Sequence, residues 1–368
     1  MKAIPMLPFF HRSTPPEAKA SAAAIATFHP TGRPAWTPRD LASLTRQSYI
    51  QNAIAHRCVR LIALSAATVP LAVSVGGKAQ AVHPLATLLT RPNPAQDCCA
   101  LLETLYGHLQ IAGNAYLEAV PDPADPTAPP RELHALRPDR MRVIPGQGGW
   151  PEGYEYRVAG RAHRFAQTDE APPILHLKTF HPLDDHYGLS PLEAAAIPVD
   201  IHNAASRWNK ALLDNAARPS GAVVYNGPDG GTLSESQYTR LKDQLESRHQ
   251  GAANAGRPIL LEGGLDWKPM SFSPSDMEFM KAKDSAAREI ALAFGIPPML
   301  LGLPGDNTYA NYAEANRAFH TQTILPLARK TLSALTHWLG ARYGEAVSVE
   351  AVRVDIMEEE ASDSKAHD

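Results

Sequence analysis

Two histidines and two aspartates stand close together in the stretch "FHPLDDHYG", at His181, Asp184, Asp185 and His186. Imidazole and carboxylate groups are common ligands of catalytic metals, and a bound metal could activate water for hydrolysis. The spacing gives no pair of histidines one helical turn apart, however, and the stretch lies between a predicted strand and a predicted helix start. A solvated turn is therefore the favoured interpretation, and a metal-dependent hydrolase stays as the alternative.

Other catalytic patterns are missing from the sequence. There is no G-x-x-x-x-G-K-[ST] loop for ATP and no G-x-S-x-G nucleophile motif. The stretch "VSVGGKAQ" has Gly76-Gly77-Lys78 without the required spacing or hydroxyl, and is typical of a hairpin turn. Ser190 in "GLSPLE" is explained by helix capping. We therefore expect a protein without enzymatic activity, bound metal or cofactor.

The composition is that of a soluble globular chain with a sizeable core. Of 368 residues, 44% are hydrophobic and 20% charged, while the 33 prolines indicate many short elements. The formal charge is −3, which argues against a tight general binder of nucleic acid. Cys58, Cys98 and Cys99 form no disulfide or zinc pattern, and no signal peptide or membrane span is evident, so we expect reduced thiols inside the cell.

The first half of the chain predicts an α+β domain. Apolar residues recur at helical spacing from Ser48 up to Pro70, and a second helix is expected from Cys98 to Ala112, closed by Gly113-Asn114. Strand-like runs are "PLAVSV", "AYLEAV", "LHALRPDRMRVI", "YEYRVA" and "ILHLKTF". Their spacing by turns predicts a mainly antiparallel sheet.

The second half predicts long helices around an insert. Ser190, Pro191 and Glu193 begin a helix that Pro198 should bend. A strand, a helix and two more strands follow in "SGAVVYNG", "SESQYTRLKDQLESRHQG", "GRPILLEGG" and "DWKPMSF". A further helix begins near Ser275 and should end with Gly295 in the left-handed conformation. After a loop, Asn311 and Glu314 start a final long helix that Pro326 should bend.

Trp208, in "RWNK", stands between basic residues that could form a stacking surface for nucleic acid. On a helix, Trp208 together with Leu212 more simply packs against a neighbouring element. Packing is therefore the favoured interpretation.

Several phrases, taken in order, resemble the portal (head-to-tail connector) proteins of tailed bacteriophages, in the short form found in siphophages, prophages and gene transfer agents. The resemblance covers roughly residues 36–340. The phrases are "NAIAHRCVRLIALSAATVPLAV", "HPLATLLTRPNPAQ", "LQIAGNAYLEAV", "YGLSPLEAA", "NAGRPILLEGGLDWKPMSFSPSDMEFMKAKDSAAREIALAFGIPPMLLG" and "TYANYAEANRAFHTQTILPL". Each phrase alone is weak, and the ordered set is specific.

The resemblance implies an α+β portal fold with long stem helices, an α/β wing, a small α/β clip insert and a much reduced crown. The implied parts are a flexible arm (1–45), the wing (46–190), the first stem helix (191–218), the clip (219–272), the second stem helix (273–298), the tunnel loop (299–310), a long kinked helix (311–345) and a short C-terminal segment with an acidic tail (346–368).

By the same resemblance, the protein is expected to form a ring, normally of twelve copies, at one vertex of a virion or phage-like capsid. Double-stranded DNA would pass through it during packaging and ejection. The other partners would be the large terminase, the major capsid protein and head-tail adaptor proteins, with no membrane. A monomeric scaffold or adaptor without a DNA role is a further hypothesis.

The expected contacts fall in three groups. The tunnel loop would present Pro304, Asp306, Asn307, Thr308 and Tyr309 to DNA, and the stem would present Lys281 and Arg288 to the channel. The clip would dock the terminase and adaptors through Tyr225, Asn226, Arg248 and Trp267.

Overall fold

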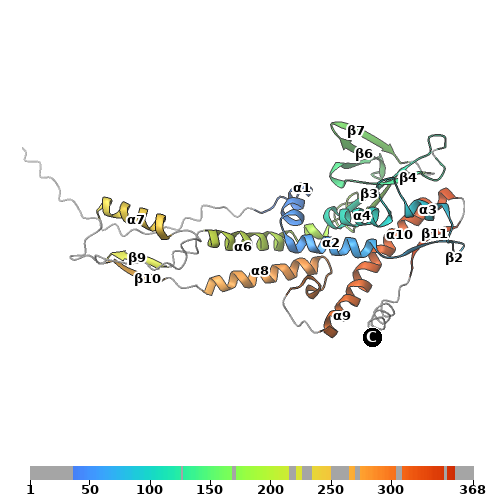
Figure 1. The fold of residues 1–368 in the computed structure, drawn as a ribbon. Coiled ribbons are helices and arrows are strands. Elements are labelled where there is room, and N and C mark those ends of the chain that lie inside the picture. Colours follow the sequence, from blue (N-terminus) through green and yellow to red (C-terminus); the bar gives the residue numbers. More distant parts are fainter. Residues whose placement is uncertain are drawn as a thin grey trace, which may run out of the picture. The chain divides into compact units, whose positions relative to one another are not determined.

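A computed structural model describes residues 36–125, 127–167, 171–214, 221–225, 234–249, 265–269, 274–303, 309–343 and 346–352 (Figure 1). Its α-helices are α1 (Leu41–Leu44), α2 (Ala53–Ala67), α3 (Pro84–Thr90), α4 (Cys98–Ala112), α5 (Pro191–Ala194), α6 (Ala196–Asp214), α7 (Glu235–His249), α8 (Pro274–Ala293), α9 (Tyr309–Phe319) and α10 (Leu325–Leu339). Shorter helical turns are η1 (Thr45–Ile50), η2 (Pro138–Arg140), η5 (Pro298–Leu301), η6 (His320–Ile324) and η7 (Gly340–Tyr343).

The strands form four small antiparallel sheets within the described residues, as the mainly antiparallel prediction requires. Their orders are β11-β1-β2, β4-β3-β8, β5-β6-β7 and β10-β9. The strands are β1 (Leu71–Val75), β2 (Lys78–Ala79), β3 (Asn114–Val120), β4 (Glu132–Leu136), β5 (Met141–Pro145), β6 (Pro151–Val158), β7 (Arg161–Ala166), β8 (Ile174–Lys178), β9 (Gly221–Tyr225), β10 (Leu265–Pro269) and β11 (Val347–Ala351).

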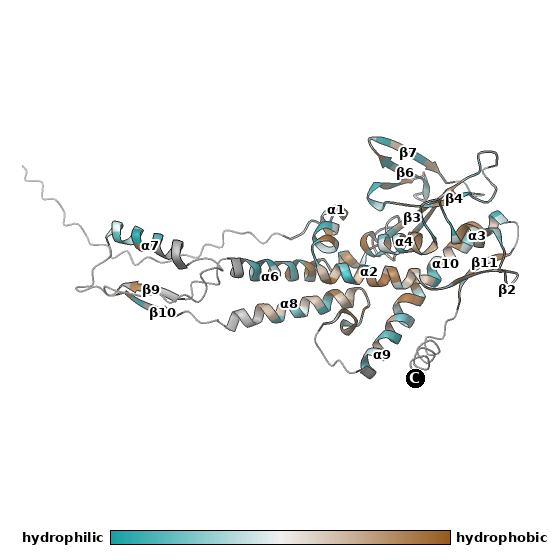
Figure 2. Cartoon of the chain, viewed as in Figure 1, coloured by the Kyte–Doolittle hydropathy of each residue, from teal (hydrophilic) through white to brown (hydrophobic). Residues whose placement is uncertain are grey.

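The main core lies where α2, α4 and α10 meet. On α2, Cys58, Ile62 and Ala66 are buried at the helical spacing that the sequence predicted. The side-chain oxygen of Asn52 starts this helix by accepting the backbone N–H groups of Ile54 and Ala55, at 3.1 and 3.0 Å. Figure 2 shows apolar residues gathered along α2, whereas the coloured part of α7 is largely polar.

The backbones of two segments that are distant in the sequence, "AGN" and "YGL", approach each other closely at glycine residues. Gly113 closes α4 with φ 67°, and a Cβ atom there would lie 2.4 Å from the carbonyl oxygen of Gly188. A Cβ atom on Gly188 would lie 2.2 Å from the carbonyl oxygen of Gly113. Asn114 secures the contact because its Oδ1 accepts the N–H of Gly188 at 2.8 Å. "AGN" and "YGL" are therefore needed for one close backbone approach.

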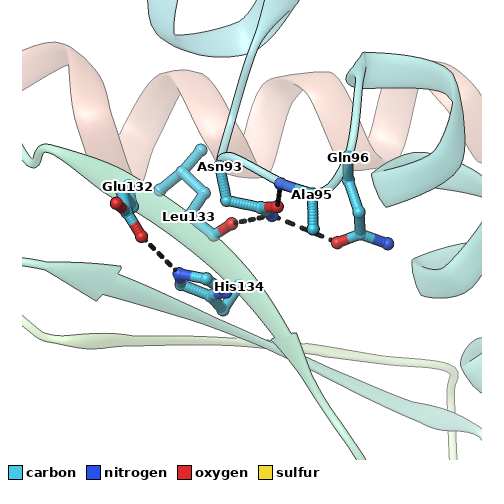
Figure 3. A network of polar contacts seen from close by, with 6 residues as sticks. All are labelled: Asn93, Ala95, Gln96, Glu132, Leu133 and His134. Carbon is cyan, nitrogen blue, oxygen red and sulfur yellow. Dashed lines mark hydrogen bonds and ion pairs between the residues drawn. The ribbon is translucent and has the colours of Figure 1, made fainter.

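The phrase "RPNPAQ" has a similar structural role (Figure 3). Asn93 accepts the N–H of Ala95 at 3.0 Å and donates to Gln96 at 3.1 Å. Its Nδ2 also donates to the carbonyl oxygen of Leu133 in β4 at 3.0 Å. The loop between α3 and α4 is thereby fixed to the sheet, because the buried amide has its polar atoms satisfied.

The predicted hairpin at Gly76-Gly77 is confirmed. Both glycines have positive φ, at 57° and 77°, and Val75 pairs with Lys78 across the turn. The sequence did not predict that β11 would pair with β1, with Leu71 opposite Ala351. The residues after the long helix thus complete the β11-β1-β2 sheet.

The first stem helix differs from its prediction. Ser190 caps the segment as expected, accepting the N–H of Glu193 at 2.9 Å. The helix then breaks at Ala195, between α5 and α6, instead of bending at Pro198. Pro198 falls in the first turn of α6, where a missing N–H removes no intrahelical hydrogen bond. The predicted single helix over 191–218 is therefore two helices up to Asp214.

The predicted arm also ends earlier than residue 45. Thr37 donates its backbone N–H to Asp200 at 3.0 Å, and its hydroxyl bonds the same carboxylate. Asp40 caps α1 by accepting the N–H of Ser43 at 2.9 Å. Because the Asp200 partner lies far away in the sequence, composition alone could not reveal this contact.

The long helix begins at Tyr309, two residues before the predicted start at Asn311. Where a bend was predicted, the chain forms a π-helical turn, η6, immediately before the first turn of α10, which contains Pro326. A proline cannot donate to the preceding turn, so a widened turn there satisfies the local geometry.

Candidate channel and partner surfaces

Helices α6 and α8 lie side by side and correspond to the predicted stem (Figure 1). Trp208 of α6 stacks on Phe279 of α8, with ring centroids 4.8 Å apart and an interplanar angle of 26°. Next to them, Asn209 donates to the sulfur of Met280 at 3.4 Å. Trp208 therefore packs against a neighbouring helix, as the sequence favoured over a nucleic-acid contact.

Lys281 and Arg288, the predicted channel-facing residues, are both exposed on α8. They are two helical turns apart, so they lie on similar sides of the helix and about 10 Å apart along its axis. This arrangement suits contact with a long polyanion. Their orientation toward a channel remains a prediction.

A well-defined turn ends α8 ahead of the predicted tunnel loop. Gly295 has φ 65°, as expected, and its N–H bonds the carbonyl of Leu292 at 2.9 Å. The N–H of Ile296 bonds the carbonyl of Ala291 at 2.9 Å, which completes a Schellman motif. Thr323 also donates its hydroxyl to the carbonyl oxygen of Gly295 at 2.8 Å. One base of the loop is thus attached to η6.

The loop itself falls largely outside the described residues. Pro304, Asp306, Asn307 and Thr308 lie there. Tyr309 was predicted as part of the loop but is the first residue of α9, because the helix starts earlier than expected. The described chain reaches the loop through η5 and Gly302, which has φ 73°.

Helix α6 is joined to the residues at the start of α2 by a buried amide network that sequence reasoning missed. Asn52 Nδ2 donates to Asn203 Oδ1 at 2.9 Å and lies 3.1 Å from His202 Nδ1. Asn203 Nδ2 donates to the carbonyl of Gln47 at 2.8 Å. Burial lowers the pKa of His202, which keeps its Nδ1 available as an acceptor. The asparagine N-cap signal at Asn52 was visible in the sequence, but its partners 150 residues away were not.

The predicted clip residues are described only in part. β9 and β10 pair antiparallel, with Tyr225 opposite Leu265 and Trp267 opposite Val223. Arg248 lies in α7. Asn226 lies outside the described residues, as does the strand predicted in "GRPILLEGG". The clip's role in docking other proteins remains a prediction.

The His181–His186 stretch is a turn. Asp184 Oδ1 accepts the N–H groups of His186 and Tyr187, at 2.7 and 2.9 Å, and these bonds lower the pKa of its carboxyl. His181 Nδ1 accepts the N–H of Leu183 at 3.1 Å. Across the described ranges, no group of three or more His, Cys, Asp or Glu side chains is placed to hold a metal ion. The hydrolase alternative has no geometric support, since the His181 and Asp184 side chains accept local backbone N–H groups.

Residues 53–366 match the family model described as "Phage portal protein". The chain belongs to the phage portal protein family. An uncharacterized protein of Rickettsia bellii is 41% identical over 307 residues, covering 82% of this chain and 78% of the relative. The portal protein of Enterobacteria phage HK97 is 25% identical over 307 residues, covering 81% and 69%.

Solved structures also resemble this chain. One from the neck of a native gene transfer agent (GTA) particle, computed with C12 symmetry, is 54% identical, covers 91% of each chain and has a TM-score of 0.70. An HK97-family phage portal protein from Corynebacterium diphtheriae is 14% identical, covers 86% and 96%, and has a TM-score of 0.55, which supports the portal fold alone. The portal protein described here is thus a structural, non-enzymatic protein, as predicted from its sequence.

No helix within the described ranges has both the length and the apolar character needed to cross a bilayer.

Proposed function

We propose that this portal protein assembles into a closed ring of twelve copies at one vertex of a GTA-like or phage-like particle, and that DNA passes through the ring. The observation that carries the proposal is 54% identity, over 91% of each chain, to a protein in a GTA neck computed with C12 symmetry. Packaging would drive DNA inward through the ring, and delivery would release it.

An exposed apolar stripe on α6 supports assembly with further copies. Ile197 and Ile201 are one turn apart and remain 50% and 38% exposed, and Ala204 continues their line. On α8, Leu292 is 78% exposed. Soluble monomers seldom leave apolar side chains aligned in this way, whereas repeated copies in a ring can bury them against each other.

The overall charge suits a conduit. Twelve copies at −3 would carry about −36, so the body of the ring would repel a polyanion weakly. Each phosphate contact would slow sliding, because releasing it requires counterions to be taken up again. A few local contacts from Lys281, Arg288 and the tunnel loop would guide DNA without holding it.

The remaining partners are assigned by region. We propose that the clip, through Tyr225, Asn226, Arg248 and Trp267, docks the large terminase during packaging and head-tail adaptors afterwards. The wing would face the major capsid protein. The energy for packaging would come from the terminase.

A loop deletion tests the conduit. Removing Pro304–Asn307 should leave ring mass unchanged and lower the DNA content of particles, because the fixed turn at Gly295 and the start of α9 are retained. The matched control removes Ala124–Thr127 from the surface loop between β3 and β4. Electron microscopy of rings and quantification of packaged DNA are the measurements. Normal DNA content in the Pro304–Asn307 deletion would contradict a tunnel role.

A further inference from the structure

The β5-β6-β7 sheet has one face on the core and the other in solvent. Tyr154 of β6 is buried with Met141 and Val143 of β5 in a small apolar cluster. Side chains alternate across a strand, so the neighbouring positions of β5, β6 and β7 project from the opposite face.

Three arginines surround one glutamate on that open face. Strand register places Glu155 between Arg142 of β5 and Arg164 of β7. The Glu155 carboxylate accepts Arg157 Nε at 2.6 Å and Arg164 Nε at 3.3 Å. The glutamate side chain is 7% exposed, whereas those of Arg157 and Arg164 are 65% and 76% exposed.

This geometry orients the guanidinium groups outward. The contacts with Glu155 use the Nε edges, so the terminal nitrogens can form further charge-assisted bonds. Hydrogen bonding by Arg157 lowers the pKa of the Glu155 carboxyl, which therefore stays ionised near neutral pH. Three guanidinium groups against one carboxylate leave a net charge of +2 on the face.

The local charge contrasts with the chain as a whole. Residues 140–167 contain five arginines and two glutamates, a formal net charge of +3, within a chain of −3. The opposite extreme is the stretch 358–368, which has five acidic residues and one lysine, a net charge of −4. The rest of the chain without that stretch would carry −3 − (−4) = +1.

Hydrogen bonds link the region around β11, which leads to the acidic stretch, with the end of β7. The N–H of Val352, just after β11, bonds the carbonyl of Pro70 at 2.8 Å, and the 16 residues that follow can span up to about 55 Å when extended. Trp338 and Arg342, shortly before β11, both donate to the Pro172 carbonyl at 2.7 Å. Pro172 lies in the connection between β7 and β8. In the same connection Gln167, directly after β7, donates its Nε2 to the carbonyl oxygen of Ile174 at 2.9 Å.

We propose that the open face of the β5-β6-β7 sheet, defined by Arg142, Arg157 and Arg164 around Glu155, is a docking surface for the acidic C-terminal segment 358–368 of the same chain. Clustered carboxylates are the chemistry that outward guanidinium forks recognise. Docking would cover a basic face that otherwise attracts phosphate. The proposal does not depend on ring formation.

Edge protection is the other role that these arginines could have, because charged side chains on an edge strand such as β7 discourage pairing with other chains. The two roles differ in an observable way. Edge protection requires no bound peptide, whereas docking requires saturable binding of the acidic segment that weakens with salt.

The test measures fluorescence anisotropy of a labelled peptide of residues 354–368 with the full-length protein. The binding partner, called the host, is the full-length protein with Glu358→Gln, Glu359→Gln and Glu360→Gln. These substitutions weaken competition between the labelled peptide and the protein's own acidic segment. On that host, a second set replaces Glu155, Arg157 and Arg164 with Gln, which removes the arginine charges without leaving a buried carboxylate unpaired. The matched control is Arg131→Gln with Arg137→Gln, two exposed arginines paired elsewhere.

Peptide affinity should fall about tenfold or more in the Glu155/Arg157/Arg164 variant and by less than about twofold in the control. The unmodified protein should bind the peptide several-fold more weakly than the host at every protein concentration, because its own segment competes. Equal peptide binding by the Glu155/Arg157/Arg164 variant and the host would overturn the proposal. The proposal would also be overturned if competition by the protein's own segment disappeared when the protein is diluted. A 25-base-pair DNA duplex that bound this face equally well in the host and in the unmodified protein would overturn it too.

Discussion

Two regions of this portal protein, named after their predicted roles as the wing (46–190) and the stem (α6 and α8), are packed differently. In the wing, backbones approach as closely as at Gly113 and Gly188, and buried amides such as Asn93 and Asn114 are fully engaged. In the stem, α6 and α8 pack together through Trp208 and Phe279, yet Ile197 and Ile201 stay exposed. The interior of the wing is closely packed within one chain, whereas the exposed stripe on α6 is surface that another copy would cover in the proposed ring.

This difference separates folding from assembly. Close packing and satisfied polar groups give the wing most of its stability, because voids and unpaired groups are costly in a core. Exposed apolar side chains on α6 add little to the folded monomer and become favourable only when buried by a partner. Substitutions in the two regions should therefore have separable effects.

The largest effect on folding is expected for Gly188→Ala. A Cβ atom there would lie 2.2 Å from the Gly113 carbonyl oxygen, and backbone cannot move aside as a flexible side chain can. The free energy of unfolding should fall by about 3 kcal/mol or more, measured by chemical denaturation. The control is Gly107→Ala in α4, where a Cβ meets nothing within 4 Å and should be neutral or stabilising by up to about 1 kcal/mol. Equal effects of the two substitutions would show that the glycine contact is unimportant.

Assembly is the target of Ile201→Asp. A charge in the exposed stripe should leave the unfolding temperature of the monomer nearly unchanged and raise the concentration needed for half-assembly by about tenfold or more, because it would have to be buried unpaired. Val82→Asp is the matched control, an exposed apolar residue in the wing. Analytical ultracentrifugation across a concentration series measures both. If Ile201→Asp assembles like the control, the stripe is not an interface.

Local signals in the sequence predicted much of this fold, and long-range partners account for what they missed. Ser190 before Pro191, the Gly76-Gly77 turn and the stop at Gly295 each act through neighbouring residues, so their types were sufficient. The pairing of β11 with β1 and the bond from Thr37 to Asp200 depend on partners far along the chain. The bend predicted at Pro198 was wrong, because the helix breaks at Ala195 and α6 restarts at Ala196, which places Pro198 in its first turn.

The candidate surfaces were predicted unevenly for the same reason. Helical spacing placed Lys281 and Arg288 on a polar face, and both are exposed. It also favoured packing of Trp208 against a neighbouring element, which the structure identifies as α8. The Asn52–Asn203 connection needs two helices to be placed in space before it can be seen. DNA contacts by the tunnel loop came from resemblance and remain a prediction.

A smaller effect, on the wing again, concerns pH. Burial lowers the pKa of His176 to about 3, while its Nε2 lies 2.9 Å from Asn114 Oδ1. The neutral form is favoured by folding, so its stabilisation is complete above the unfolded pKa of about 6.5 and is lost as the pH falls from there toward 3. The loss is about 1 kcal/mol per pH unit. His176→Gln should flatten this dependence between pH 6.5 and 5 in thermal unfolding, whereas exposed His337→Gln should not. An unchanged slope in His176→Gln would assign the acid sensitivity to other groups, such as His108, whose pKa burial lowers to about 4.

The most direct test of the central claim is the native mass of the purified full-length protein over a range of concentrations. A closed ring predicts a discrete species of about twelve subunits, near 480 kDa for a 39.8 kDa chain, and Ile201→Asp should require a higher concentration to form it. A protein that stays monomeric at every concentration, with and without particle components, would contradict the account.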